Sequence, residues 1–292
     1  MPQTPVTSTH VERITREGRE GRSDLVAVEE PLQIILELGE GHARREESLA
    51  MTMRTPGHDH DLVIGFLFAE GVIASMDDLL ALRHCTSSET PDNVIRAVLR
   101  EHVVVPARLL ERTLTVTSAC GICGERTVDA LSKAGCAPVE IRPRHFAPQA
   151  IRRALALLEE SQAWFRRTGG THGAALFDES GALLVRREDV GRHNALDKLV
   201  GAWLHAPAHP TDSSFVIVSS RASFELVQKT VRAGIPMMVA IGAPSSLAIE
   251  TAARFGVTLI GFANEDRFNV YSAAERVAHE GTEGRTEAEA AG

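Results

Sequence analysis

The chain has 292 residues, of which 43% are hydrophobic and 24% charged, a composition typical of a globular protein with one large or two ordinary domains. Its formal net charge of −8 and its 4% of aromatic residues argue against a nucleic-acid partner, which needs cationic and stacking surfaces. The longest apolar stretch, residues 62–69, is far shorter than the roughly 20 residues that cross a bilayer, and the N-terminus lacks an apolar signal-peptide core. We therefore expect a cytoplasmic protein without a membrane partner.

Two charged ends frame the predicted globular part. Residues 1–24 carry four arginines and four acidic residues without a periodic apolar pattern, so we expect a disordered tail there. Residues 279–292 are acidic and equally poor in apolar periodicity, and we expect a second disordered tail. Neither tail holds a predicted site.

The first predicted lobe covers residues 25–145 and is rich in strands. One helix interrupts the strands after Pro56 and Gly57, with Asp59 as its expected N-cap and Gly71 as its expected stop. Short apolar runs, several of them alternating, predict strands over residues 25–30, 32–38, 47–53, 94–100 and 113–117.

The second predicted lobe, residues 146–278, alternates helices with strands. It opens with a helix over residues 148–165, followed by a hairpin over 173–189 that turns at residues 179–181. Helices and strands then alternate, and such a series forms a parallel sheet covered by helices. The sequence therefore predicts an α/β fold with a smaller strand-rich N-terminal lobe. The expected helices are 193–204, 223–234 and 245–256, and the expected strands are 215–220, 237–242 and 258–262.

Two of the four cysteines, Cys120 and Cys123, form a C-x-x-C pair in the run CGICG. The run lies between a predicted strand and a predicted helix, where the helix N-terminus favours the thiolate. The absence of a second pair disfavours structural zinc. A dithiol redox site, two buried thiols and a nucleophilic thiol that carries a group covalently all remain open. Cys85 and Cys136 stand alone, and we expect ordinary core or surface residues.

Polar runs in the second lobe suggest a ligand site. The run EDVGRHNALDK, residues 188–198, opens a helix and could gather Arg192, His193 and Lys198 around an anion. A capped helix with a surface ion pair fits the spacing equally well. The segments 219–225, 242–246 and 264–267 follow strands whose carboxyl ends are where ligands bind in a parallel sheet, although turn and capping chemistry would also place polar residues there.

Two histidine-containing runs are less specific. His172 follows two glycines and precedes a predicted strand, and a lone histidine in such a place is more often structural. The run HDHD at residues 58–61 resembles a metal pair but lies at a helix start without further ligands at suitable spacing. We therefore expect a capping cluster at HDHD and predict no metal site.

Taken together, these runs resemble the FdhD family, the formate dehydrogenase accessory sulfurtransferases. The resemblance extends from about residue 25 to residue 275. It implies a cytidine deaminase-like C-terminal lobe, a cytoplasmic location and a homodimer. The runs that carry it are TPGHDHDLVIGFLFAEGVI, SACGICG, EDVGRHNALDKLVG, SSRASFELVQKTVRAGIP, APSSLAIETAARFGVTLIGFA and RFNVY.

The resemblance also implies a function. Members carry sulfur from a cysteine desulfurase to the molybdenum cofactor, in its bis-guanine-dinucleotide form, before the cofactor enters formate dehydrogenase. Cys120 matches the cysteine that carries the persulfide, and Cys123 matches the second cysteine of the motif. A guanine nucleotide is expected to mimic the cofactor. The family's cofactor-binding stretch matches Phe262, Ala263, Asn264, Glu265, Asp266 and Arg267, and we add His172, Arg192, His193, Lys198 and Arg221 as candidate contacts.

The chain departs from the family pattern in small ways. Asn264 stands where a basic residue is expected, Ser220 where glycine is expected, and Ser245 where threonine is expected. Two other function classes stay open: a thiol–disulfide oxidoreductase that cycles a Cys120–Cys123 disulfide, and a cofactor chaperone without sulfur chemistry. A deaminase-like hydrolase is disfavoured because the zinc-ligand motif H-x-E…P-C-x-x-C is absent.

Overall fold

The computed structural model describes residues 4–39, 44–85, 91–110, 137–139, 146–205 and 211–279, and the chain forms two compact units. Unit 1 consists of residues 1–125, 162–173 and 187–207, and unit 2 of residues 126–161, 174–186 and 208–292. The structure thus differs from the expected division into consecutive lobes, because two segments of the predicted C-terminal lobe belong to unit 1. The predicted strand over 113–117 and the CGICG run lie outside the described residues.

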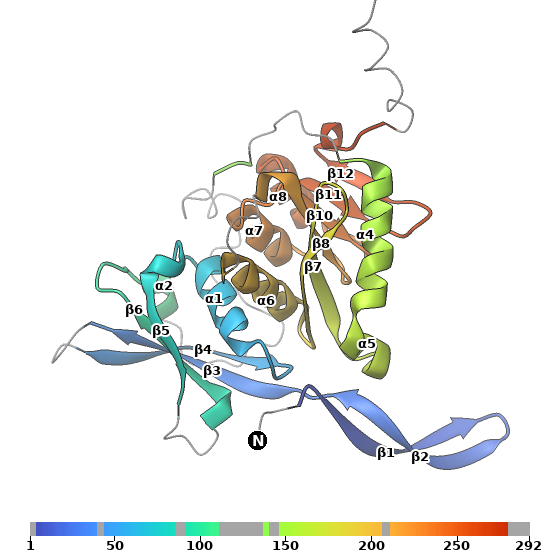
Figure 1. The fold of residues 1–292 in the computed structure, drawn as a ribbon, viewed down its shortest axis with the longest axis horizontal. Coiled ribbons are helices and arrows are strands. Elements are labelled where there is room, and N and C mark those ends of the chain that lie inside the picture. Colours follow the sequence, from blue (N-terminus) through green and yellow to red (C-terminus); the bar gives the residue numbers. More distant parts are fainter. Residues whose placement is uncertain are drawn as a thin grey trace, which may run out of the picture. The chain divides into compact units, whose positions relative to one another are not determined.

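Unit 1 is built on a four-stranded sheet with the order β4-β3-β6-β5 (Figure 1). Its strands are β3 (Glu30–Leu38), β4 (Arg45–Arg54), β5 (Leu79–His84) and β6 (Val94–Leu99). Three of the expected strands are confirmed, and β5 was not predicted. One face of the sheet packs on helix α1 (Asp59–Ala69) through a shared apolar core. Helix α2 (Ala107–Leu110) follows the sheet.

Helices α1 and α6 (Arg192–His205) cross at very short range within unit 1. A Cβ at Gly65 of α1 would overlap the backbone carbonyl of Asp197, and a Cβ at Gly201 of α6 would overlap the carbonyl of Asp61. Both glycines are therefore required by the contact, because no larger residue fits between the two backbones. This crossing ties α6, which is distant in sequence, to the core of unit 1.

The prediction of a disordered tail over residues 1–24 is wrong. Strands β1 (Val6–Thr15) and β2 (Gly18–Ala27) form a regular antiparallel hairpin, a sheet of its own with a continuous register from Val6–Ala27 to Thr15–Gly18. Polar composition suggested disorder, but the alternation of threonine, valine and isoleucine along β1 favours a strand. The predicted acidic tail over 279–292 lies almost wholly outside the described residues.

A six-stranded sheet has the order β12-β11-β10-β9-β7-β8. Its central strands β9, β10 and β11 are parallel, as expected, whereas β7 pairs antiparallel with β9 and β12 antiparallel with β11. The hairpin turn between β7 and β8 is confirmed, with Gly181 at φ +82°. The strands are β7 (His172–Asp178), β8 (Leu183–Asp189), β9 (Ser214–Val218), β10 (Met237–Ala240), β11 (Thr258–Gly261) and β12 (Asn269–Ser272).

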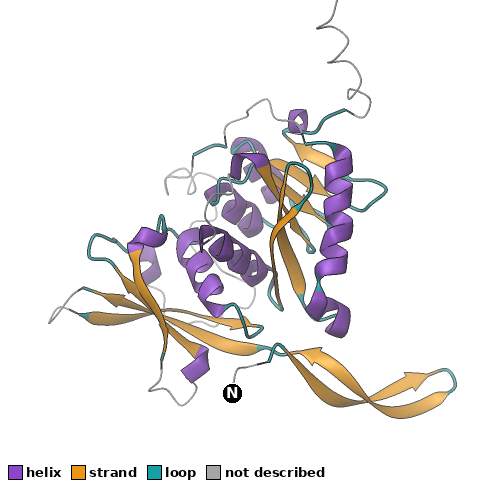
Figure 2. Cartoon of the chain, in the orientation of Figure 1, coloured by secondary structure: helices purple, strands orange, loops and turns teal. Residues whose placement is uncertain are grey.

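Helices cover both faces of this sheet (Figure 2). Helix α4 (Pro148–Ser161) packs on the face that carries Phe215 and Ile217 of β9. Helices α7 (Phe224–Arg232) and α8 (Ser246–Arg254) pack against β10 and β11. Strands buried on both faces are typical of α/β folds, and the expected α/β class is confirmed.

The expected single helix over 148–165 is divided in two. Helix α4 ends at Ser161, and α5 (Ala163–Thr168) begins after Gln162, whose ψ of 79° is not helical. The buried carboxylate of Glu188 accepts hydrogen bonds from the backbone N–H groups of Trp164 and Phe165, at 3.1 and 2.8 Å. A distant carboxylate thus caps the first turn of α5, and that contact is not visible in local sequence.

Short 3-10 turns complete the described part of the fold. They occur at Met76–Asp78, Pro91–Asn93, Thr211–Ser213 and Ala274–Arg276. The last of them buries Arg276, whose guanidinium donates to the carbonyl oxygens of Pro236 and Gly256. These bonds fix the described C-terminal segment onto unit 2.

Candidate functional site

The predicted sulfur-carrying residues, Cys120 and Cys123, lie outside the described residues, as does Cys136. Cys85 is described and is buried, as expected, at the end of β5. The guanidinium of Arg96 donates to its sulfur at 2.7 Å. Burial and this contact are those of a core cysteine, so Cys85 is not a candidate for sulfur transfer.

Three loops of unit 2 leave the same edge of the sheet, at the carboxyl ends of β9, β10 and β11. Backbone hydrogen bonds join them: Ala222 N–H donates to the carbonyl of Ala243 at 3.2 Å, and Phe262 N–H donates to that of Gly242 at 3.1 Å. We call the exposed surface of these loops the strand-end rim, defined by Arg221, Ile241, Phe262, Asn264 and Arg267. It lies at the edge where parallel sheets bind their ligands.

Two glycines bring the rim loops into close contact. A Cβ at Gly242 would lie 2.9 Å from the Cα and N atoms of Arg221, and a Cβ at Gly261 would lie 2.8 Å from the Cδ atom of Pro244. Distances under 3.0 Å are not found for real Cβ atoms. The loop geometry therefore depends on glycine at both positions, and it fixes the backbone from which the rim side chains project.

The rim combines apolar surface with cations. Phe262 is 50% exposed and Ile241 40% exposed, while Arg221 and Arg267 are also exposed. Phe262 has φ +53°, a left-handed conformation that is uncommon for a bulky residue and that concentrates at functional sites. An open aromatic ring and guanidinium groups on the same set of loops are suited to a ligand with a flat ring and phosphates.

The side chain of Asn264 stabilises the turn that it begins in the strand-end rim. Its Oδ1 atom accepts hydrogen bonds from the backbone N–H groups of Asp266 and Arg267, at 3.0 and 2.8 Å, and its own N–H donates to the carbonyl of Arg267. Asparagine is well suited to such a turn. The side chain that replaces the expected basic residue therefore shapes the loop, while Glu265 and Asp266 are exposed beside it.

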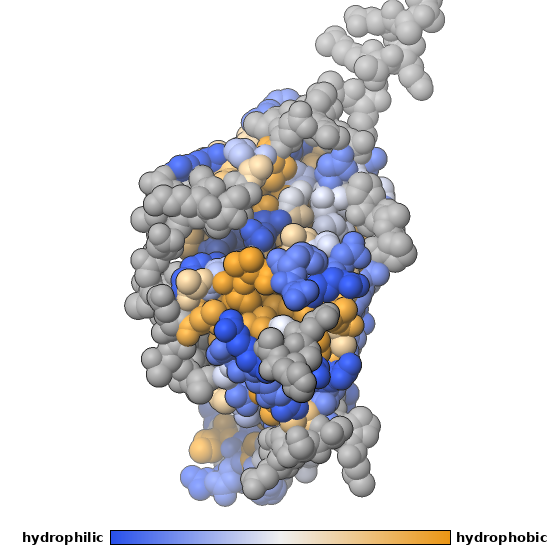
Figure 3. Space-filling model, turned by 90° about the vertical axis from the view of Figure 1, so that its left-hand side faces the viewer, coloured by the Kyte–Doolittle hydropathy of each residue, from blue (hydrophilic) through white to orange (hydrophobic). Residues whose placement is uncertain are grey.

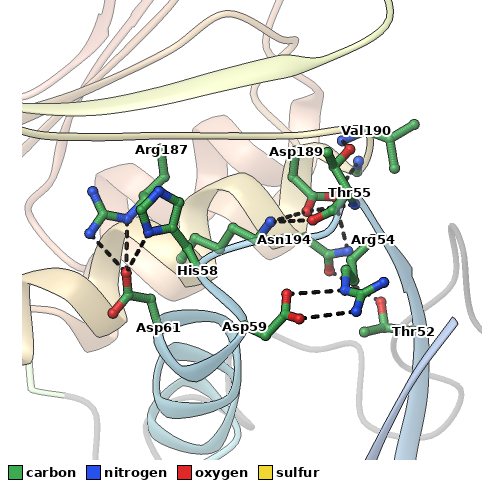
Figure 4. A network of polar contacts seen from close by, with 12 residues as sticks. Thr52, Arg54, Thr55, His58, Asp59, Asp61, Arg187, Asp189, Val190 and Asn194 are labelled. Atoms are coloured by element: carbon green, nitrogen blue, oxygen red, sulfur yellow. Dashed lines mark hydrogen bonds and ion pairs between the residues drawn. The ribbon is translucent and has the colours of Figure 1, made fainter. Parts of the chain in front are cut away.

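The EDVGRHNALDK run forms a buried polar network in unit 1 (Figure 4). The Nζ atom of Lys198 lies 2.7 Å from Oδ2 of Asp189 and donates to the backbone carbonyl of Thr55 at 2.7 Å, and both charged side chains are 0% exposed. Oδ2 of Asp189 also accepts from Thr55 N–H, and Oδ1 accepts from Gly191 N–H. Burial raises the pKa of Asp189, and the Lys198 ammonium opposes that effect.

This network matches neither the anion site nor the surface ion pair that the spacing had suggested. Lys198 has no exposed surface and is occupied by Asp189 and Thr55, so the structure removes it from the set of cofactor contacts. Asn194 is used in the same way, since its amide donates to the carbonyl of Met53 at 2.7 Å and accepts from Thr52 at 3.2 Å. The run connects the loop between β4 and α1 with the start of α6.

The remaining residues proposed from the run are partly exposed. Arg192 and His193 begin α6, and the Nε atom of Arg192 is buried without a hydrogen-bond partner among the described residues. His172 begins β7 in the same unit, and burial, followed by the charge of Arg192, lowers its pKa. The predicted cofactor contacts are therefore divided between unit 1, with these three residues, and the strand-end rim of unit 2.

The HDHD run is held by ion pairs, and the expected capping cluster is wrong, because no side-chain hydrogen bond caps the start of α1. Arg54, which is fully buried, contacts both carboxylate oxygens of Asp59 at 3.0 Å, and Arg187 contacts Asp61 at 2.8 Å. Burial alone would raise the pKa of Asp61, but hydrogen bonds from His58 and Arg187 lower it. The N-cap is His58 and not Asp59 as expected. Within the described ranges, no group of three or more His, Cys, Asp or Glu side chains is placed to hold a metal ion.

Sequence reasoning missed several of these features. Thr55 and Arg54 gave no signal, because their partners are distant in the chain. Ile241 could have been found, since it directly follows a predicted parallel strand. Exposed apolar side chains were also missed: Leu80 on β5, Val104 before α2 and Leu110 at the end of α2. Figure 3 shows apolar surface gathered on the face that is turned to the viewer.

No helix in the described part of the chain is both long enough and apolar enough to cross a membrane.

Comparison with known proteins points to one protein family. The model of the FdhD/NarQ family matches residues 27–278. Proteins named sulfur carrier protein FdhD, from Streptomyces coelicolor and Mycobacterium tuberculosis, are 44% and 40% identical to this chain; each alignment covers 88% of the chain and 90% or 92% of the relative.

A solved structure agrees with these matches. The crystal structure of a candidate formate dehydrogenase accessory protein from Desulfotalea psychrophila matches with a TM-score of 0.72 and 25% identity, covering 94% of this chain and 100% of that one. The family model and the relatives each span most of the sequence. The chain therefore belongs to the FdhD/NarQ family.

Proposed function

We propose that the chain is a sulfurtransferase that carries sulfur as a persulfide on Cys120 from a cysteine desulfurase to the molybdenum cofactor, its substrate, for use by formate dehydrogenase. The observation that carries the proposal is membership of a family whose relatives are named sulfur carrier proteins. The protein acts in the cytoplasm as a homodimer and meets two protein partners in turn, the desulfurase and the dehydrogenase.

The sulfur chemistry follows thiol–disulfide exchange. The Cys120 thiolate attacks the outer sulfur of the desulfurase persulfide, a new S–S bond forms on Cys120, and the desulfurase thiolate leaves. In the delivery step, the outer sulfur of the Cys120 persulfide is passed to the molybdenum cofactor. When Cys123 attacks Cys120, the outer sulfur leaves at the sulfide level and the two cysteines form a disulfide, so the dithiol is oxidised while the sulfur is reduced. A thiol reductant restores the pair.

The strand-end rim is proposed to hold the guanine dinucleotide form of the cofactor. Phe262 offers an open ring for stacking a guanine base, and Arg221 and Arg267 offer guanidinium groups for phosphates. The fit is good because the same rim presents both kinds of surface at the edge where ligands bind. His172, Arg192 and His193 of unit 1 are proposed as further contacts.

A nucleotide titration tests the rim. Calorimetry with GDP, used as a mimic of the cofactor, should detect binding to the full chain. Phe262→Ala should weaken it roughly 5- to 150-fold, since stacking of one base contributes roughly 1–3 kcal/mol. Phe165→Ala is the matched control, because Phe165 is 45% exposed but lies in α5, away from the rim loops in the sequence. Equal effects of both variants would refute the rim as the binding place.

Reconstitution of formate dehydrogenase activity distinguishes a sulfurtransferase from a cofactor chaperone and from a thiol–disulfide oxidoreductase. It combines the chain with a cysteine desulfurase, cysteine and formate dehydrogenase that carries unsulfurated cofactor. Wild type should restore formate oxidation, and Cys120→Ala should not. Full restoration by Cys120→Ala would indicate a cofactor chaperone instead. Turnover of a Cys120–Cys123 disulfide by a thioredoxin-type reductant, without any need for the desulfurase, would indicate an oxidoreductase.

A further inference from the structure

The β1–β2 hairpin has little support from the rest of unit 1. It is a separate two-stranded sheet, most of its side chains are exposed, and Ile14 near its tip is 71% exposed. In Figure 1 the ribbon runs out beyond the four-stranded sheet of the same unit. An isolated two-stranded ribbon is at best marginally stable in water, so a regular hairpin of this length requires a further contact.

The hydrogen-bond pattern shows which backbone groups of β1 have no partner strand within the described part of the chain. Val28 N–H donates to the carbonyl of Pro5 at 2.9 Å, so these two residues form a hydrogen-bonded pair, and such pairs alternate along an antiparallel ladder. Following the register, the N–H and C=O groups of alternate β1 residues point away from β2. These outward-facing residues are Ser8, His10, Glu12 and Ile14. At its base the hairpin approaches α5 and Gly170 through β2.

Strand β1 lacks most features that protect edge strands against pairing. Natural edge strands are blunted by proline, charged side chains (lysine above all), bulges or shortness, and of these β1 has only the charged pair Glu12 and Arg13. Strand β1 runs for ten residues without proline or lysine, and its register with β2 is continuous. Valine, isoleucine and threonine, which favour strands, occupy six of its positions. Among the described strands, only β2 pairs with β1, and the outer edge of β1 is therefore open to another strand.

We propose that a second copy of this chain pairs with it, so that β1 and the partner's β1 join antiparallel around a twofold axis at Val11. The product is a four-stranded sheet that crosses the dimer. A twofold axis requires a strand that is complementary to itself, and β1 meets this requirement in that register. The inference specifies the interface of the proposed homodimer and is independent of the sulfur chemistry.

Charge and side-chain type select the register. Centred on Val11, the two strands place each His10 opposite Glu12 of the other copy and Val11 opposite Val11. Glu12 already pairs with Arg19 at 3.0 Å, so each imidazole N–H can donate a hydrogen bond to a carboxylate that is already held in place. A register centred on His10 would oppose the two histidines. Residues 1–24 have four arginines and four acidic residues, so the arms carry no net charge and do not repel each other, although each chain has a net charge of −8.

The test measures dimerisation of the full chain by sedimentation and light scattering. His10→Pro removes an outward N–H from each copy without removing a bond inside the hairpin, and should raise the dimer dissociation constant at least about tenfold. The matched control is Ser23→Pro, at the position directly opposite His10 on β2, which removes an outward N–H from the other edge. It should leave dimerisation unchanged.

Every outcome is decisive. A monomeric wild type would overturn both the interface and the proposed homodimer. A dimer that His10→Pro does not weaken, or that Ser23→Pro weakens equally, would overturn this interface alone, and neither result would bear on sulfur transfer. Weakening by Ser23→Pro only would assign the contact to β2 instead.

A cross-link tests the register. Directly opposed residues that are not hydrogen-bonded have Cα atoms about 4.5 Å apart, within the range for a disulfide. Under mild oxidation, Val11→Cys should therefore give an intermolecular disulfide between the two introduced cysteines, located by peptide mass mapping. Thr15→Cys is the control, because its two copies would lie roughly 27 Å apart along the paired strands. Equal cross-linking of both variants would overturn the register.

Discussion

The buried Asp189–Lys198 pair dominates unit 1 at the scale of single residues. Removing one partner of a fully buried pair leaves an uncompensated charge and costs about 3–5 kcal/mol. We therefore predict a loss of that size in the free energy of unfolding for Lys198→Met, measured by urea denaturation. Lys229→Met, a lysine on partly exposed α7 surface, should cost less than about 1 kcal/mol. Adding Asp189→Leu to Lys198→Met should cost less than the two single changes summed; strict additivity would contradict the pairing.

Protonation of His172 makes the free energy of unfolding depend on pH. Burial and the charge of Arg192 lower its pKa in the folded protein, while in the unfolded chain the pKa stays near 6.5. The unfolded state therefore takes up the proton first as the pH falls, so this contribution to stability is present above about pH 6.5 and is lost below it. We predict that His172→Gln flattens the decline in the free energy of unfolding between about pH 7.5 and 5.5. Parallel curves for variant and wild type would rule this out.

Single residues also show where sequence reasoning stops. The C-x-x-C pair and the rim segment 262–267 could be proposed from local runs and strand ends. The fate of Lys198 could not, because its spacing in a helix fits a phosphate contact and a surface ion pair equally. The structure shows neither, since Lys198 forms a buried ion pair whose burial depends on the distant Thr55 loop.

Helix packing is the decisive feature at the scale of elements. At the α1–α6 crossing, Gly201→Ala places a methyl group onto the carbonyl of Asp61. We predict a loss of about 1–3 kcal/mol or more in the free energy of unfolding, because the backbones must separate. Glu159→Ala, at an exposed position of α4, should change stability by less than about 0.5 kcal/mol. A stability loss no larger than that of the control would show that the crossing tolerates a side chain.

Elements differ in how well the sequence predicts them. The alternation of helix and strand after residue 190 is regular, and each predicted element there is found within a few residues. The hairpin of residues 6–27 was missed because both of its faces are polar, so no buried face imposes an apolar alternation. The division of α4 from α5 was missed because Glu188, which caps α5, comes from another strand.

At the scale of the whole molecule, the two units are not consecutive along the chain. Residues 162–173 and 187–205 belong to unit 1, whereas residues 146–161, 174–186 and 211–279 belong to unit 2, although the sequence suggested two consecutive lobes. Helix α6 buries Leu196, Leu199 and Val200 and crosses α1 of unit 1. We therefore predict that a fragment of residues 146–279, the lobe that the sequence suggested, fails to fold alone. Circular dichroism of the fragment beside the full chain measures this, and a cooperative unfolding transition in the fragment would contradict it.

The central claim is that Cys120 carries sulfur, and intact-protein mass spectrometry tests it most directly. The chain is incubated with a cysteine desulfurase and cysteine, as wild type, Cys120→Ala and Cys85→Ala, the last being the buried control. Wild type and Cys85→Ala should gain about 32 Da per sulfur, reversibly on reduction, and Cys120→Ala should gain nothing. A gain that persists in Cys120→Ala, or wild type that only loses two hydrogens on mild oxidation, would contradict the account.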